Sequence, residues 1–156
     1  MDIIIKKAGL CDIKALNNML KDLFSIEDDF TSDSNKQKTG LEMIISGVTG
    51  GVIFIAQCGL RPVGMVNLQK IISTAAGGIS ILLEDLYVEP DIRGQGVGSM
   101  LLEEAIKWGR EEHAVRMQLG ADMRNAPAIS FYQSKGFMQS NLVLHYKSII
   151  SSGNNV

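Results

Sequence analysis

Residues 84–99 read Glu-Asp-Leu-Tyr-Val-Glu-Pro-Asp-Ile-Arg-Gly-Gln-Gly-Val-Gly-Ser. The apolar run that leads into and through this stretch predicts a β-strand, and Pro90 with Asp91 ends it. A helical pattern follows directly after three glycines at alternate positions: Gly94, Gly96 and Gly98. Glycines spaced in this way allow a backbone to approach a ligand closely and to adopt dihedrals that a Cβ would forbid.

A helix that begins after such a loop directs its unpaired N–H groups, and the positive end of its dipole, at whatever occupies the loop. Arg93 adds a permanent cation beside it. A tight turn alone would need one glycine, so three glycines and an arginine exceed that requirement. Strand, loop and helix together predict a site for a phosphate-bearing ligand.

Several phosphate loops share this design. The P-loop needs a lysine after its last glycine, and none follows Gly98. The dinucleotide fingerprint fits nearly, with Ser99 in place of the third small residue and Asp122 at the distance of a ribose contact. The stretch also matches the pattern Arg/Gln-x-x-Gly-x-Gly/Ala. With its acidic strand and the Val-x-Pro that ends it, the stretch resembles motif A of the GCN5-related N-acetyltransferase (GNAT) superfamily.

Periodicity and turn signals predict the remaining elements. Strands are expected at 3–7, 52–58, 62–68, 79–88, 114–120, 137–138 and 142–146, and helices at 13–24 after Asp12, 40–46, 98–112 and from Asn125 to 135, with a loop at 71–78. Three consecutive strands make an antiparallel meander, which disfavours the parallel dinucleotide fold.

The expected order is β α α β β β α β α β β, an α+β fold with a mixed, mostly antiparallel central sheet flanked by helices on both faces. This is the GNAT order. A second stretch, Asn125 to Phe137, reads Asn-x-x-Ala-x-x-Phe-Tyr-x-x-x-Gly-Phe and resembles the family's motif B. The resemblance covers about residues 1–147, so we expect one GNAT domain there and a C-terminal tail at 148–156.

Composition excludes several classes of protein. The 156 residues suit one domain, and the net charge of −2 without a basic run argues against nucleic acid as a partner. The two cysteines, Cys11 and Cys58, form no metal-binding pattern, so no metal is expected. No apolar run reaches about 18 residues, so no membrane span is predicted and the cytoplasm is the default address.

The resemblance implies acetyl-CoA as cosubstrate and assigns residues to it. Backbone N–H groups of the strand end would polarise the thioester, the loop would hold the pyrophosphate, and Asn125 would reach the pantetheine arm. The expected cofactor-binding residues are Leu86, Tyr87, Val88, Arg93, Gly94, Gln95, Gly96, Val97, Gly98, Ser99 and Asn125. Arg93 could instead pair with an acid such as Asp91.

Three residues are candidates for catalysis. An acceptor amine is protonated near neutral pH, so acetylation needs a proton acceptor. Glu84 and Asp85 are consecutive on a strand and should face opposite sides of the sheet. The resemblance implies that Glu84 is the base, directly or through water, that Asp85 is structural or orients the substrate, and that Tyr132 protonates the departing thiolate.

These features predict an acetyl-CoA-dependent N-acetyltransferase, an acyltransferase that acetylates a primary amine of a small molecule or peptide by direct transfer in a ternary complex. No suitably placed cysteine suggests an acyl-enzyme. The alternatives are a degenerate acyl-CoA-binding sensor or interaction module and a nucleotide (NAD)-binding protein. The acidic segment 27–29 would favour a cationic acceptor, and a homodimer is possible.

Overall fold

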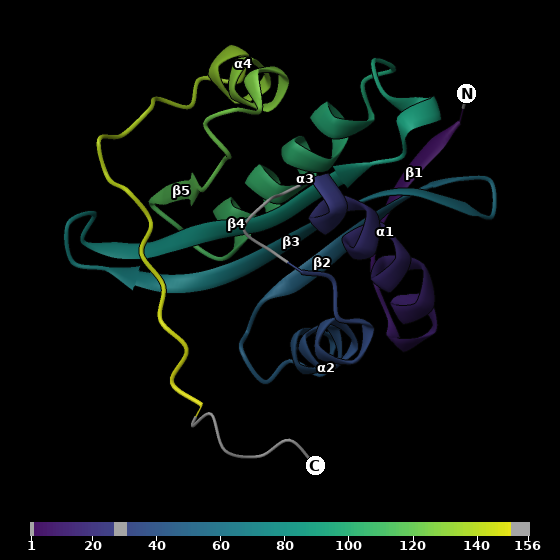
Figure 1. Cartoon of the computed structure of the whole chain (residues 1–156). Coiled ribbons are helices and arrows are strands. Elements are labelled where there is room, and N and C mark those ends of the chain that lie inside the picture. The colour runs from purple at the N-terminus through teal and green to yellow at the C-terminus, as the bar shows by residue number, and fades with distance from the viewer. Residues whose placement is uncertain (1, 27–30, 151–156) are drawn as a thin grey trace. The chain divides into compact units, whose positions relative to one another are not determined.

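The computed structural model describes residues 2–26 and 31–150 of the chain, which divides into two compact units, Met1–Leu119 and Gly120–Val156. The first unit carries every strand of the sheet, and the second carries one helix (Figure 1). Each unit is described by itself below. The acidic segment 27–29 lies outside the described residues.

The first unit is built on a five-stranded sheet in the order β1-β2-β3-β4-β5. Neighbours among the first four strands are antiparallel, and only β5 runs parallel to its neighbour β4. The bounds are β1 Ile3–Lys7, β2 Val52–Cys58, β3 Arg61–Ser73, β4 Gly78–Val88 and β5 Arg116–Leu119. The mostly antiparallel sheet confirms the predicted fold class and excludes the doubly wound dinucleotide fold.

Helices cover both faces of this sheet (Figure 1). Helices α1, Ile13–Ile26, and α2, Ser34–Ile45, lie on one face, and α3, Val97–Glu111, lies on the other. The core beneath α1 and α2 contains apolar side chains from both helices and from alternate positions of three strands: Leu16, Met19, Leu20, Leu41, Ile53, Ile55, Met65 and Tyr87. The crossover from β4 through α3 to the parallel β5 is the one expected from the sequence.

A β-bulge interrupts the pairing of β3 with β4. Asn67 is opposite Asp85, whereas the next residue, Leu68, is opposite Leu83, so Glu84 is an extra residue on β4. The bulge shifts the alternation of side chains by one position. As a result Leu83 and Asp85, which a regular strand would place on one face, lie on opposite faces, and Asp85 shares the α1–α2 face with Tyr87. That Glu84 faces the opposite side of the sheet from Asp85 stays a prediction.

Two elements are longer than predicted. Helix α2 begins at Ser34 because Asp33 caps it, its carboxylate accepting hydrogen bonds from the backbone N–H groups of Asn35 and Lys36. Half of the predicted loop at 71–78 is instead strand, since β3 and β4 pair as far as Ser73 opposite Gly78, and only 74–77 form the turn. Asp12, expected to cap α1, is instead the last residue of a 3₁₀ turn, Leu10–Asp12, whose N-cap is Gly9. The Asp12 carboxylate accepts a hydrogen bond from the Gly9 N–H.

The second unit contains α4, Ala126–Ser134. Asn125 caps it as predicted, accepting a hydrogen bond from the Ala128 N–H at 3.1 Å, and Gly136 ends it with φ of 86°. The strands predicted at 137–138 and 142–146 are not formed. A strand needs a neighbour for its backbone N–H and C=O groups, and the described residues of this unit supply none.

Gly64 lies where β3 passes close to β4 and α3. A Cβ there would stand 2.9 Å from the Tyr87 carbonyl oxygen and 3.1 Å from the Leu101 side chain. We therefore expect Gly64→Ala to lower the free energy of unfolding by about 1–3 kcal/mol. Gly40→Ala is the matched control, because no atom lies within 4 Å of its Cβ position in α2, and it should stabilise by about 0.5–1 kcal/mol. Denaturant unfolding measures both, and equal effects would contradict the packing described here.

Candidate functional site

Strand β4 extends beyond the end of its parallel neighbour, β5. β5 pairs with β4 only from Ser80 to Leu83, while β4 continues to Val88. Within the first unit, the edge of β4 from Leu86 to Val88 on that side therefore has no strand beside it. Backbone N–H and C=O groups along this open edge are placed to bind an extended ligand.

The glycine loop follows this open edge directly. After a 3₁₀ turn at Pro90–Ile92, Gly94 and Gly96 adopt φ of 75° and 86°, a conformation that other residues adopt at a cost. Gly96 is the N-cap of α3, and no atom lies within 4 Å of the Cβ position at Gly94 or Gly96. The first N–H groups of α3, at Val97, Gly98 and Ser99, lack intrahelical acceptors. This combination fits a pyrophosphate.

Two arginines organise the loop in different ways. Arg93 donates from Nε to the Val88 carbonyl at 2.8 Å and lies over the Tyr87 ring, 5.6 Å from its centroid. Asp91 is paired instead with Arg61 of β3, which donates to both carboxylate oxygens at 2.7 and 2.9 Å. The pairing of Arg93 with Asp91, considered from the sequence, is therefore wrong. The Gln95 side-chain amide donates to the Asp91 carbonyl at 3.3 Å.

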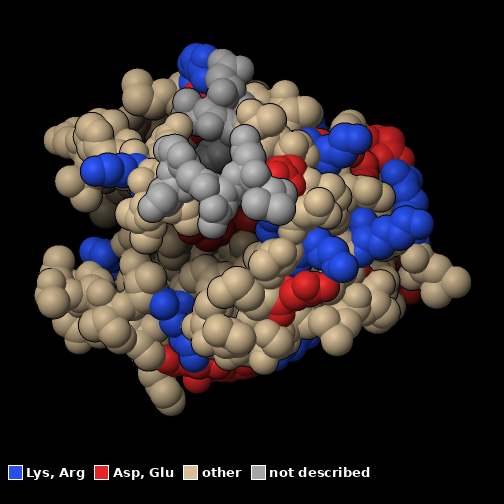
Figure 2. Space-filling model, turned by 60° about the horizontal axis from the view of Figure 1, so that its bottom comes forward, with Lys and Arg blue, Asp and Glu red and all other residues tan. Residues whose placement is uncertain are grey.

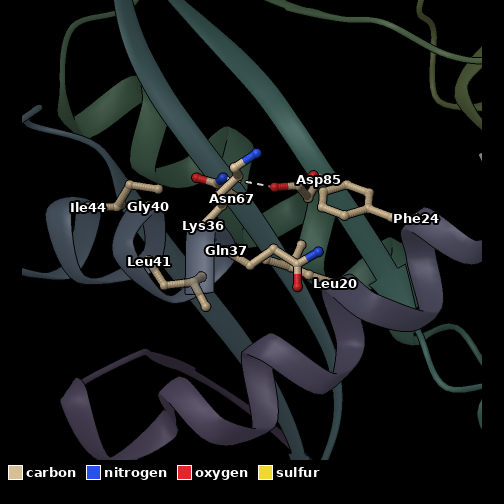
Figure 3. Close-up of a pocket in the computed structure, with 9 residues that line it drawn as sticks. All are labelled: Leu20, Phe24, Lys36, Gln37, Gly40, Leu41, Ile44, Asn67 and Asp85. Atoms are coloured by element: carbon tan, nitrogen blue, oxygen red, sulfur yellow. Dashed lines mark hydrogen bonds between the residues drawn. The ribbon is translucent and has the colours of Figure 1, made fainter. Parts of the chain in front are cut away.

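A pocket of about 270 Å³ lies between α1, α2 and the bulged part of the sheet, and we call it the α1–α2 pocket. Its lining comes from four elements (Figure 3): Leu20 and Phe24 of α1, Lys36, Gln37, Gly40, Leu41 and Ile44 of α2, Asn67 of β3 and Asp85 of β4. Figure 3 shows Asn67 and Asp85 meeting on the sheet side, with the side chains of α1 and α2 gathered around the same space.

Asp85 is the carboxylate of this pocket. Burial raises its pKa from 3.8 to about 6; the Asn67 amide, which donates to Oδ2 at 2.9 Å, opposes that rise, and the charge of Glu84 adds to it. Glu84 itself is exposed. At neutral pH the Asp85 side chain is thus an ionised but poorly hydrated carboxylate in a largely apolar setting.

A chain of hydrogen bonds holds Asn67 in place. Its Oδ1 accepts from the Gln69 amide at 3.0 Å, and Gln69 Oε1 in turn accepts from the Thr49 hydroxyl at 2.9 Å. The orientation of each amide is fixed by its partner, so the Asn67 Nδ2 group is directed at Asp85. Sequence reasoning missed Asn67, although one signal was present: a lone amide between Val66 and Leu68 in an apolar strand.

Two predicted site residues, Asn125 and Tyr132, belong to the second unit. The Asn125 side chain is engaged in capping α4. The Tyr132 ring packs edge-on against Phe131 and Phe137, with centroids 5.3 and 5.7 Å away, and no residue of α4 is fully buried. The roles expected of both residues at the acetyl-transfer site stay predictions.

Other kinds of site find little support. Among residues 2–26 and 31–150, no group of three or more His, Cys, Asp or Glu side chains could hold a metal ion. Within the same residues, no helix is long and apolar enough to cross a membrane. Both signs of charge occur on the face shown in Figure 2, as expected for a net charge of −2.

The fold and the loop together define a class, namely α+β proteins with a glycine loop between the fourth strand of a mostly antiparallel sheet and the helix that follows it. Comparison with known families identifies it further. The Acetyltransferase (GNAT) family matches residues 15–137, and the chain belongs to this family. Motif A and motif B were therefore interpreted correctly as family signatures.

The individual proteins and structures that this chain resembles share only a modest sequence identity with it. An uncharacterised N-acetyltransferase of Methanocaldococcus jannaschii is 29% identical over 91 residues, which are 58% of this chain and 40% of that protein. Among solved structures, a possible acetyltransferase of Clostridium difficile 630 has a TM-score of 0.82 at 17% identity and covers 96% of this chain and 99% of its own. An aminoglycoside N-acetyltransferase in complex with CoA has the same TM-score and identity and covers 96% of each chain.

The matches span only part of the curated relatives, from 33% to 64% of their length. The solved structures at 17% identity show the shared fold and nothing finer. Any acceptor must therefore be argued from this chain's own residues.

The raised pKa of Asp85 has a consequence for stability. Ionising a carboxylate whose folded-state pKa is about 6 instead of 3.8 costs the folded state at most about 3 kcal/mol. That cost is absent below about pH 4 and complete above about pH 6. We expect Asp85→Asn to be more stable than wild type at about pH 8, with the difference vanishing as the pH falls to about 4.

Urea unfolding of both proteins across this range measures the difference. Asp91→Asn is a control of opposite sign, because Arg61 lowers the pKa of Asp91 and its ionised form stabilises the fold. Its deficit should be present near neutral pH and shrink in acid. A pH-independent difference between wild type and Asp85→Asn would show that Asp85 ionises as freely as in the unfolded chain.

Proposed function

We propose that this protein is an acetyl-CoA-dependent N-acetyltransferase that acetylates an amine of a small molecule or peptide by direct transfer in a ternary complex. The observation that carries the proposal is the adjacency of three features on β4 and α3: the carboxylates of Glu84 and Asp85, the open edge at Leu86–Val88, and the glycine loop.

The loop would bind the pyrophosphate of CoA. The N–H groups from Gln95 to Ser99 and the positive end of the α3 dipole would face the phosphate oxygens, with the Arg93 guanidinium beside them. The pantetheine arm would lie along the open edge of β4, with the Asn125 side chain reaching it. A relative solved in complex with CoA supports this use of the fold.

The chemistry would consist mainly of positioning. Glu84 would accept a proton from the acceptor ammonium, directly or through water, and the free amine would attack the thioester carbon. The new C–N bond would form as the C–S bond breaks, N–H groups near Leu86–Val88 would stabilise the negative oxygen, and the nitrogen would release its remaining surplus proton to water. Tyr132 would donate a proton to the departing thiolate and regain one from solvent, while Asp85 would orient the acceptor.

Ligand stabilisation provides the first test. Acetyl-CoA at a hundredfold excess over Kd should stabilise the fold by about 2.7 kcal/mol and raise the melting temperature, whereas NAD should leave it unchanged. Gly98→Val, at a position inside α3 where φ is already helical, should reduce the acetyl-CoA shift more than it lowers the melting temperature of the free protein. A shift with NAD and none with acetyl-CoA would refute the proposal.

A second test separates the two catalytic roles by pH. Glu84→Gln removes the proton acceptor, so the rate of thiol release with an amine should fall at neutral pH by about 10²-fold or more and recover in part as the pH rises and free amine accumulates. Tyr132→Phe removes only the proton donor, so its deficit should shrink as the thiolate becomes stable at higher pH. Full activity of Glu84→Gln across about pH 6 to 9 would remove Glu84 as the base.

A further inference from the structure

The α1–α2 pocket combines one ionised group with apolar walls. Asp85 faces it from the sheet, and the aliphatic or aromatic side chains of Leu20, Phe24, Leu41 and Ile44 face it from the two helices (Figure 3). Leu20 and Leu41 are buried, with 5% and 2% of their surface exposed, so these walls belong to the core and are preformed. A ligand there would exchange water for hydrocarbon over most of its surface.

We propose that the acceptor is a small monoamine with an aliphatic or aromatic body, bound in the α1–α2 pocket with its ammonium group against the Asp85 carboxylate. This inference rests on the acetyl transfer proposed above. It goes beyond it by assigning a substrate class. The ammonium would partly restore the solvation that Asp85 loses on burial, and the hydrocarbon body would lie against the helix walls.

The position of the pocket suits an acceptor. β5 stops pairing with β4 at Leu83, so Asp85 lies on the unpaired part of β4 and immediately precedes Leu86. A group held at Asp85 would therefore lie next to the strand end where the thioester would be bound. Glu84, the proposed base, is the adjacent residue, and its charge is close enough to raise the pKa of Asp85. One carboxylate would hold the ammonium and the other would accept its proton.

The charges around the pocket argue for a single cation. Of its lining residues, Asp85 is the acid and Lys36 is the base; the Lys36 side chain is 80% exposed, which places it at the mouth, and its Nζ lies 3.7 Å from the Asp33 carboxylate. Inside the pocket a second ammonium on the acceptor would meet the apolar walls, and burying an unpaired charge costs far more than burying a methyl group. A volume of about 270 Å³ lies just below the range of about 300–1,000 Å³ for pockets of drug-sized ligands, so the acceptor is small.

Asn67 is a positioning residue for this interaction. Its Nδ2 group occupies one oxygen of Asp85, and the chain through Gln69 to Thr49 prevents its amide from turning over. Asn67 thus engages Oδ2 and leaves Oδ1 for a ligand in the pocket that Asp85 lines. Among the described residues, the ionisable groups that act on Asp85 or line the pocket with it are Glu84 on its own strand and Lys36 on α2; β3 contributes the neutral Asn67, and α1 contributes Leu20 and Phe24 to the lining.

A matched series of amines tests the proposal. Pentylamine, aminopentanol and cadaverine share one carbon chain and end in a methyl group, a hydroxyl group and a second ammonium. Thiol release from acetyl-CoA should give a kcat/KM for pentylamine at least about tenfold above that for cadaverine, with aminopentanol between them. A preference for cadaverine, or turnover confined to peptides, would overturn the proposal.

Binding measured without turnover separates this inference from the proposed function. Calorimetry should detect pentylamine binding to wild type, and Asp85→Asn should weaken it by about tenfold or more. Glu42→Gln, on the same helix as Lys36 but paired with Lys38, is the matched control and should bind as wild type does. Pentylamine binding at Asp85 without thiol release would refute the acetyl transfer alone. Equal binding by wild type and Asp85→Asn would refute the pocket assignment even where acetyl transfer is observed.

Two further variants distinguish positioning from mere structure. Asn67→Leu removes the hydrogen bond that lowers the pKa of Asp85, so the acid limb of the pentylamine KM should move to higher pH, a change that loss of packing would not produce. Ile44→Glu adds a carboxylate to a half-buried wall and should shift the preference toward cadaverine. An unchanged pH profile in the first variant and an unchanged preference in the second would both count against the geometry proposed.

Discussion

The site depends on one extra residue in one strand. Regular pairing of β3 with β4 would place Asp85 on the same face as Leu83, beneath α3, where a carboxylate would be surrounded by the core. The bulge at Glu84 changes that register and puts Asp85 opposite Asn67 on the other face. Bulges change the direction of side chains in this way at functional sites. Here the bulge moves the Asp85 carboxylate from a face where it would be buried without a hydrogen-bond partner to a face where it has one. The α1–α2 pocket exists as a polar site because of this local departure from strand geometry.

The glycine loop is stabilised from outside as well as by its own residues. Arg61, at the start of β3, donates hydrogen bonds to both carboxylate oxygens of Asp91, and the Gln95 side-chain amide donates to the backbone carbonyl of the same residue. An exposed ion pair contributes little stability in itself. Its effect is geometric, because a bidentate pair fixes the conformation of the turn that directly precedes Gly94 and Gly96. These contacts fix the position of the loop relative to the antiparallel hairpin of β2 and β3, and with it the position of the start of α3.

The features that depend on a few neighbouring residues could be predicted from the sequence, whereas those that depend on contacts between distant parts of the chain could not. The strand at 3–7, the Asn125 cap and the glycine loop each rest on a few neighbouring residues, and the structure contains all three. The bulge depends on how β3 and β4 align over their whole length, which no local pattern encodes. The apolar residues at 142–146 read as a strand, yet a strand forms only where a partner edge is offered. Asp33 is a residue type typical of helix N-caps, and its capping explains why α2 begins before the predicted residue 40.

The two carboxylates show why local reading and tertiary context must be combined. Motif and chemistry single out Glu84 and Asp85 together, but their separation into different environments comes from the sheet and the helices that cover it. Glu84 is exposed, while Asp85 is held by Asn67 among apolar walls. Neighbouring acids whose environments differ in this way can take different tasks at one pH. Exposure keeps a proton acceptor in exchange with water, and burial favours the binding of a cation by a carboxylate. The roles proposed for Glu84 as the base and for Asp85 in binding the ammonium are consistent with where each side chain lies.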